Sequence, residues 1–155
     1  MTTPYAKATS GTKAREEITK VLRRFGCESI GFLDDFENHE ILLAFTHRGR
    51  PMQIRASAKG WAQMFLRERP HSDRMHHTKH DHEQAALRQG HIAVNSILRD
   101  WIKGQMTAIE SGILSFEAVF MPYMLTNDGR ALIDRLAETN LLPEPTPPRV
   151  IPLQK

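Results

Sequence analysis

Histidine is the residue type in this sequence best suited to chemistry, and five of the eight histidines fall within residues 70–82. Imidazole binds metal ions and titrates near neutral pH, so such a segment offers either a metal site or a pH-sensitive charge. If the segment is helical, His76, His80 and Glu83 share one face, because positions i, i+4 and i+7 lie on the same side of a helix. This trio with water has the composition of a zinc or iron site.

Two features oppose a metal at this trio. Arg74 and Lys79 lie among the candidate ligands, and the segment has hardly any apolar residues to form a dry pocket. The favoured interpretation is therefore a solvated linker that gains positive charge as the pH falls, with no metal and no cofactor. A small metal-dependent hydrolase built on the trio is kept as an alternative.

Other catalytic signatures are missing from the sequence. There is no G-x-S-x-G, no Walker loop and no G-x-G-x-x-G, and the single cysteine, Cys27, follows a helix-ending glycine, where it is best interpreted as a small apolar filler. Asp34, Asp35 and Glu37 occur together in a hairpin connection, which favours a solvated turn over an acid/base pair. These features argue against an enzyme.

Basic charge is concentrated in the first half of the chain. The sequence has 21 Lys+Arg against 18 Asp+Glu, a formal net charge of +3, and residues 1–70 hold 12 of the basic and 8 of the acidic residues. A high local density of positive charge attracts phosphates, so the clusters could form a phosphate-binding face. A basic face that contacts only solvent is an alternative of equal weight. Seven arginines fall in three clusters: Arg23 and Arg24; Arg48, Arg50 and Arg55; Arg67 and Arg69.

The second arginine cluster belongs to a predicted hairpin, His47-Arg48-Gly49-Arg50. Gly49 can take the positive φ of a tight turn. The hairpin arginines, together with neighbouring basic residues, could contact a phosphate backbone. Aromatic residues fall on predicted inner faces, so base stacking is not expected to dominate. The predicted nucleic-acid-binding residues are Arg23, Arg24, Arg48, Arg50, Arg55 and Lys59.

The elements that position these residues follow from hydrophobic periodicity. Residues 12–25 have helical spacing, and three alternating segments, 29–34, 40–46 and 51–56, predict an antiparallel meander. A second helix is predicted over 58–69. The fold class is therefore α+β, with helices 12–25 and 58–69 expected to cover one face of the sheet. This is also the element order of a double-stranded RNA-binding domain.

The rest of the chain divides by composition. We expect a flexible arm over 1–11, a helix–three-strand–helix unit over 12–69, a His-rich linker over 70–82, a helical part over 83–140 and a Pro-rich tail over 141–155. In the long helix, Gly90 and Gly104 suggest close packing against a neighbour. The helix has an apolar stripe from Leu87 to Ile113 that is wide enough to predict a homo-oligomer.

Length and composition restrict the setting. A chain of 155 residues fits one domain, or one domain with a small appendage. One cysteine excludes a disulfide framework, and the apolar runs are too short to span a bilayer or to form a signal peptide. We therefore expect a cytoplasmic protein with no membrane contact.

Two stretches resemble a family of short uncharacterised proteins encoded by phages and prophages near replication and recombination genes. Residues 43–55 are similar to the strand pair of that family, and residues 108–120, followed by the turn at 127–130, are similar to its helix, sharp stop and connector. The resemblance covers most of the chain and implies no catalytic residues. This chain departs from the family ahead of the long helix, where an Arg-rich stretch is replaced by His76, His77, His80 and His82.

The sequence and the resemblance together predict a non-enzymatic nucleic-acid-binding accessory protein of phage type, acting in replication, recombination or repair. The first alternative is a phage protein-interaction module that inhibits a host defence complex through the long helix and the Pro-rich tail. The nucleic acid type and any host or phage protein partner are left open.

Overall fold

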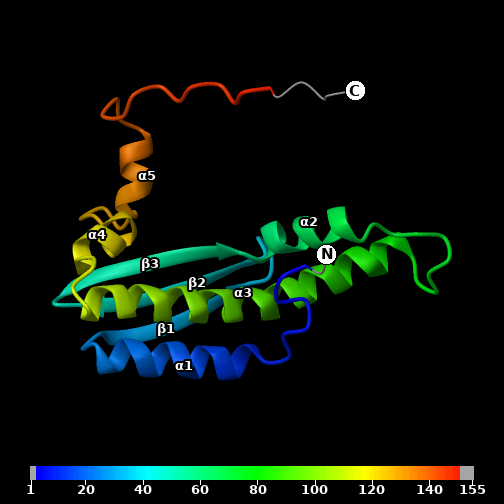
Figure 1. Ribbon diagram of the computed structural model, residues 1–155, viewed down its shortest axis with the longest axis horizontal. Coiled ribbons are helices and arrows are strands. Elements are labelled where there is room, and N and C mark those ends of the chain that lie inside the picture. The colour runs from blue at the N-terminus through cyan, green and yellow to red at the C-terminus, as the bar shows by residue number, and fades with distance from the viewer. Residues whose placement is uncertain (1–2, 151–155) are drawn as a thin grey trace.

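The computed structural model describes residues 3–150 and has the predicted α+β class, with a three-stranded antiparallel sheet in the order β1-β2-β3. Helices α1 and α3 lie side by side on one face of this sheet (Figure 1). The elements are α1 Gly11–Arg24, β1 Glu28–Asp35, β2 Glu40–His47, β3 Arg50–Ser57, α2 Ala58–Glu68, α3 Lys79–Glu110, α4 Phe116–Phe120, the 3-10 turn η1 Met121–Tyr123 and α5 Leu132–Ala137.

Helix α1 begins one residue before its predicted start, because Ser10 caps it by accepting a hydrogen bond from the Lys13 N–H. Its apolar spacing buries four residues against the sheet and α3: Ala14, Ile18, Val21 and Leu22. Gly26 then turns the chain into β1 with a φ of 96°.

The sheet has the predicted alternation. Ile41, Leu43 and Phe45 of β2 point to the helical face and are at most 1% exposed. On the opposite face, Leu33, Leu42 and Arg55 form one cross-strand row.

The helix that packs beside α1 is α3, whereas residues 58–69 had been expected there. Helix α2 continues directly from β3 and packs against α3 instead (Figure 1). The physical reason is that α3 provides the longer apolar face. Its buried residues Ala93, Val94, Leu98, Ile102 and Met106 extend the core along the sheet.

One of the two glycines of α3 marks a close contact, as predicted, and the other does not. A Cβ atom built on Gly90 would lie 2.6 Å from the Ala58 carbonyl oxygen, so Gly90 lets α2 approach α3. A Cβ atom on Gly104 would have no heavy atom within 4 Å. The prediction of close packing was therefore wrong for Gly104.

A single hydrophobic core joins the predicted helix–three-strand–helix unit to the predicted helical part, from Ile18 of α1 to Phe120 of α4. Helix α3 is described over its whole length, and none of its large apolar residues is among the exposed ones. The chain itself therefore covers the part of the predicted stripe that lies in α3, whereas Ile113, beyond the helix, is 75% exposed. Self-association stays a prediction, without support from the buried part of the stripe.

The structure differs from the expected flexible arm, because residues 3–10 are attached to the helices. The Trp61 indole N–H donates to the Pro4 carbonyl at 2.9 Å, the Tyr5 hydroxyl donates to Asp100 at 2.6 Å, and the Gln89 amide donates to the Ala8 carbonyl at 2.9 Å. Residues 1–2 of the predicted arm lie outside the described residues.

Arg15 connects α1, β1 and α3 through contacts that the sequence did not reveal. Its guanidinium donates to both carboxylate oxygens of Asp34, and its Nε–H donates to Asn95 Oδ1 at 2.8 Å. The same group lies 5.0 Å from the centre of the Phe32 ring. Asn95, which is 3% exposed, has its side-chain oxygen satisfied in this way.

Beyond α3, burial decreases along the chain. Phe120 of α4 is fully buried, whereas α5 has no buried residue and residues 141–150 are exposed without regular structure (Figure 1). Residues 151–155 of the predicted Pro-rich tail lie outside the described residues.

Within the described part of the chain, no helix has the length and apolar character needed to cross a membrane.

Candidate nucleic-acid interface

The β2–β3 hairpin presents two of the predicted arginines at one extremity of the sheet (Figure 1). His47 pairs with Arg50, so the turn has only two central residues, Arg48 and Gly49, with φ values of 51° and 77°. Positive φ at both positions defines a type I′ turn, whose twist matches that of the strands. Arg48, Gly49 and Arg50 are exposed.

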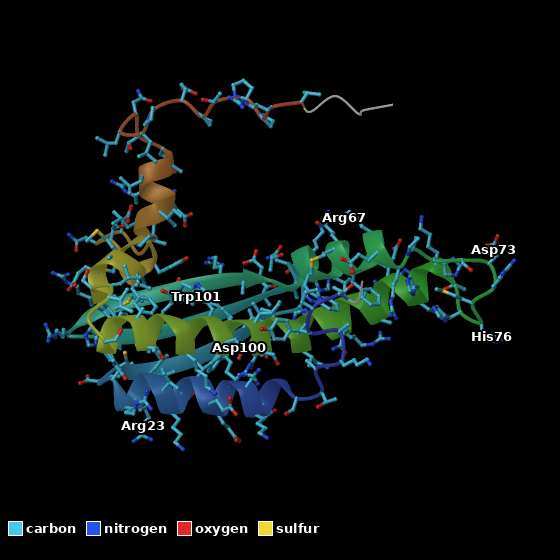
Figure 2. The ribbon with its side chains drawn as sticks, in the orientation of Figure 1. Arg23, Arg67, Asp73, His76, Asp100 and Trp101 are labelled. Carbon is cyan, nitrogen blue, oxygen red and sulfur yellow. The ribbon has the colours of Figure 1, made fainter. Side chains whose placement is uncertain are left out.

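Arg23 and Arg24 reach the same end of the sheet, because α1 ends where β1 and the hairpin begin (Figures 1 and 2). The Phe25 and His47 rings lie 5.2 Å apart and bring the adjacent Arg24 and Arg48 to a common region. Arg24 also contacts Glu110 of α3 at 3.3 Å, which reduces its availability for another anion.

A small cavity of about 170 Å³ lies beside the hairpin and is lined in part by His47, Arg48, Arg50 and Glu117. Burial and the positive charge of Arg48 lower the pKa of His47, whereas Glu117 acts in the opposite direction. His47 is therefore neutral near pH 7, and the two arginines provide the positive charge.

The other two predicted contacts lie elsewhere. Arg55 is on the open face of β3, where its guanidinium is 3.5 Å from Glu40. Lys59 follows the far end of β3, and a strand of eight residues spans about 23 Å. The structure thus brings together Arg23, Arg24, Arg48 and Arg50 but not Arg55 and Lys59.

Cys27 lies 3.8 Å from His47 Nδ1, but its surroundings do not activate it. The side chain is 5% exposed, and burial raises the pKa of the thiol to about 11. The nucleophilic thiolate is therefore scarce at neutral pH. This agrees with the interpretation of Cys27 as a small apolar filler.

The candidate metal trio is not assembled. Helix α3 begins at Lys79, so His76 precedes it, at the far end of the loop between α2 and α3, and is not aligned with His80 and Glu83 (Figure 2). Within residues 3–150, no group of three or more His, Cys, Asp or Glu side chains could hold a metal ion.

Three other histidines fix the loop to the helices, which sequence reasoning missed. A carbonyl only accepts hydrogen bonds, so the 2.7 Å contact from His82 Nε2 to the Arg69 carbonyl places a proton on that nitrogen. The other ring nitrogen, His82 Nδ1, lies at hydrogen-bond distance from His77 Nε2, at 3.3 Å. His71 donates to the His77 carbonyl at 2.8 Å. Only the irregular loop brings these rings together, so no helical spacing indicates them.

A further histidine pair holds the β1–β2 turn on α3. His39 Nδ1 lies 3.3 Å from His91 Nε2, and the other ring nitrogen of His91 is buried with no hydrogen-bond partner among the described residues. Burial first, and then the positive charges of His39 and Arg15, lower the pKa of His91, with Asp34 opposing them.

The lowered pKa values of His47 and His91 predict that acid destabilises the fold. Below about pH 6.5 the unfolded chain binds protons that the folded chain excludes at these two rings. Their contribution to stability is therefore complete above that pH and is lost as the pH falls towards the lower folded-state values. Urea unfolding between pH 7.5 and 5.5 should show a decreasing free energy of unfolding, and His91→Gln should reduce the slope. His76→Gln, at the loop tip, is the matched control, and an equal change of slope in both variants would contradict the assignment.

Comparison of the chain with protein families, with curated proteins and with solved structures found no match.

Proposed function

We propose that this protein binds nucleic acid without catalysis and that the β2–β3 hairpin makes the principal contact. One observation carries this proposal. The two-residue turn between β2 and β3 presents Arg48 and Arg50, both exposed and neither in an ion pair with another described residue. Guanidinium groups bind phosphates bidentately, so two exposed arginines at one turn are suited to contact a phosphate backbone.

The surroundings of the hairpin support phosphate contacts more than base stacking. Arg23 lies at the same end of the sheet, also with no ion-pair partner in residues 3–150. The nearby aromatic rings of Phe25, His47 and Phe116 pack on one another. Binding should therefore depend little on sequence, as expected for an accessory protein of phage type in replication, recombination or repair.

The alternatives have less support. The metal-dependent hydrolase needed His76, His80 and Glu83 on one helical face, and His76 lies outside the helix. The protein-interaction module relied on the long helix, whose apolar side chains face the core, and on the Pro-rich tail, which is exposed over residues 141–150. Salt dependence separates this module from nucleic-acid binding, because counterion release affects only the latter strongly.

The test removes the hairpin charges without disturbing the turn. Asparagine tolerates positive φ and is favoured before glycine in a type I′ turn, so Arg48→Asn preserves the hairpin. Combined with Arg50→Gln, it should weaken binding to all sequences alike and lower the slope of log K against log salt by about one unit per lost contact. Fluorescence anisotropy with labelled single- and double-stranded oligonucleotides, at salt concentrations from about 50 to about 400 mM, measures the affinity and its salt dependence.

Lys59→Gln is the matched control, because it removes one positive charge at the opposite end of β3. We expect it to leave the affinity nearly unchanged. Unchanged binding by the hairpin variant, or an equal loss in the control, would refute the assignment of the hairpin. Binding that does not respond to salt would refute the phosphate contacts altogether.

A further inference from the structure

A second basic region lies away from the hairpin, under the N-terminal arm. The arm crosses α3 and reaches the start of α1 (Figure 1). An open cavity of about 550 Å³ is lined by residues of the arm, α1 and α3. This volume is within the range of small-molecule sites, roughly 300–1,000 Å³. The anchors at Pro4, Tyr5 and Ala8 hold the arm in place, so the cavity exists without a ligand.

The charged side chains that line this cavity are all basic: Lys7, Lys13 and Arg99. Arg99 already contacts Asp100 at 2.9 Å and Glu17 at 3.6 Å, which hold it in position. Lys7 and Lys13 are exposed and form no ion pair within the described part of the chain. The lining therefore favours an anion.

The N-terminus of α1 is directed to the same place. Gly11 approaches α3 so closely that a Cβ atom there would lie 2.9 Å from Asn95 Nδ2. The first turn of α1 has no acidic residue to compensate its partial positive charge. The N–H groups of this first turn have no acceptor within the helix. Ser10 accepts a hydrogen bond from one of them, the Lys13 N–H, and the others are left for a ligand or water. Such a terminus is suited to a phosphate group.

Ser96 is the independent indication of a ligand. The residue is only 5% exposed, yet it lines the cavity. Its hydroxyl makes no hydrogen bond to another residue in the described part of the chain, and its oxygen is not among the fully buried unpartnered atoms there, so it is accessible from the cavity. The neighbouring Asn95, by contrast, is bonded to Arg15 and to the His91 carbonyl. Ser96 thus provides an unused polar group at the floor of a basic cavity.

We propose that this cavity binds the phosphate group of a small ligand. Lys7 and Lys13 neutralise its charge, Ser96 hydrogen-bonds to it, and the start of α1 provides backbone N–H donors. The proposal does not depend on nucleic-acid binding at the hairpin, because the two regions use different residues.

Calorimetric titration of the full chain at low salt tests this site with three probes: inorganic phosphate, adenosine 5′-monophosphate and adenosine. We expect saturable binding, with one site per chain, for both phosphate compounds and none for adenosine. Tighter binding of the monophosphate would identify a nucleotide as the source of the phosphate, and equal binding would identify free phosphate. Saturable binding of neither compound, or adenosine binding as tightly as its monophosphate, would overturn the proposal.

Variants then locate the binding. Lys7→Gln combined with Lys13→Gln should weaken binding of the phosphate probes by about tenfold or more. Ser96→Ala should weaken it by about 10- to 100-fold, the strength of a hydrogen bond to a charged group. Lys20→Gln removes a charge from the same helix outside the cavity and is the matched control. An equal loss in Lys20→Gln would overturn the location, as would full affinity in both cavity variants. The Arg48→Asn and Arg50→Gln variant should bind the phosphate probes normally, so failure here is distinguishable from failure at the hairpin.

Discussion

Gly90→Ala is expected to destabilise the protein by about 1–3 kcal/mol, the usual cost of overpacking, although alanine is the better helix former by about 1 kcal/mol. The new Cβ atom would lie 2.6 Å from the Ala58 carbonyl oxygen and 3.5 Å from the Trp61 ring. A backbone carbonyl cannot rotate away as a flexible side chain can. The Ala58 N–H is also held, because it donates to the His39 carbonyl at 2.8 Å. The helices α2 and α3 must therefore separate.

Gly104→Ala is the matched control in the same helix, and it should stabilise the protein by up to about 1 kcal/mol. Both substitutions have the same intrinsic helix propensity, so the difference between them measures the packing of α2 on α3. Denaturant unfolding monitored by circular dichroism gives both free energies. Equal effects of the two substitutions would contradict the close contact at Gly90.

The strands and the first helix could be predicted because each has a simple period. Alternation in β2 identified Ile41, Leu43 and Phe45 as the inner face, and Gly49 identified the turn. Periodicity shows which face of an element is apolar, but not which element covers it. For this reason the sequence could not reveal that α3, and not α2, lies beside α1.

The arrangement of the hairpin arginines could also be predicted, because a two-residue turn places Arg48 and Arg50 together whatever the rest of the fold. The separation of Lys59 follows from strand length, since β3 begins at Arg50 and ends at Ser57. Sequence reasoning placed all six basic residues in one patch, without allowing for this length.

The contacts of single polar groups could not be predicted. The arm is held by the Pro4 and Ala8 carbonyls, and a backbone carbonyl leaves no sign in the sequence. Arg15 has the spacing of an ordinary surface residue on an amphipathic helix, yet it joins Asp34 and Asn95. The cavity under the arm depends on both sets of contacts, so it was not anticipated.

Phe120→Ala is expected to cost about 3–5 kcal/mol, the usual penalty for removing a buried phenylalanine. Phe120 is 0% exposed, and its ring packs against Phe45 of β2 at 5.7 Å, Trp101 of α3 at 5.8 Å and Phe116 at 4.8 Å. One ring therefore joins the sheet, the long helix and α4. Because these elements share one core, the loss should appear in the whole protein and not only near α4.

Differential scanning calorimetry distinguishes one cooperative core from two independent parts divided at residues 70–82. A single core predicts one transition that moves as a whole to lower temperature in Phe120→Ala. Independent parts would give two transitions, of which only the one for the helical part would move. Met121→Ala is the matched control, because the next residue in the chain is 44% exposed and should cost less than about 0.5 kcal/mol. Two separated transitions would restore the division predicted from composition, and the sheet would then have to remain folded without the contact between Phe45 and Phe120.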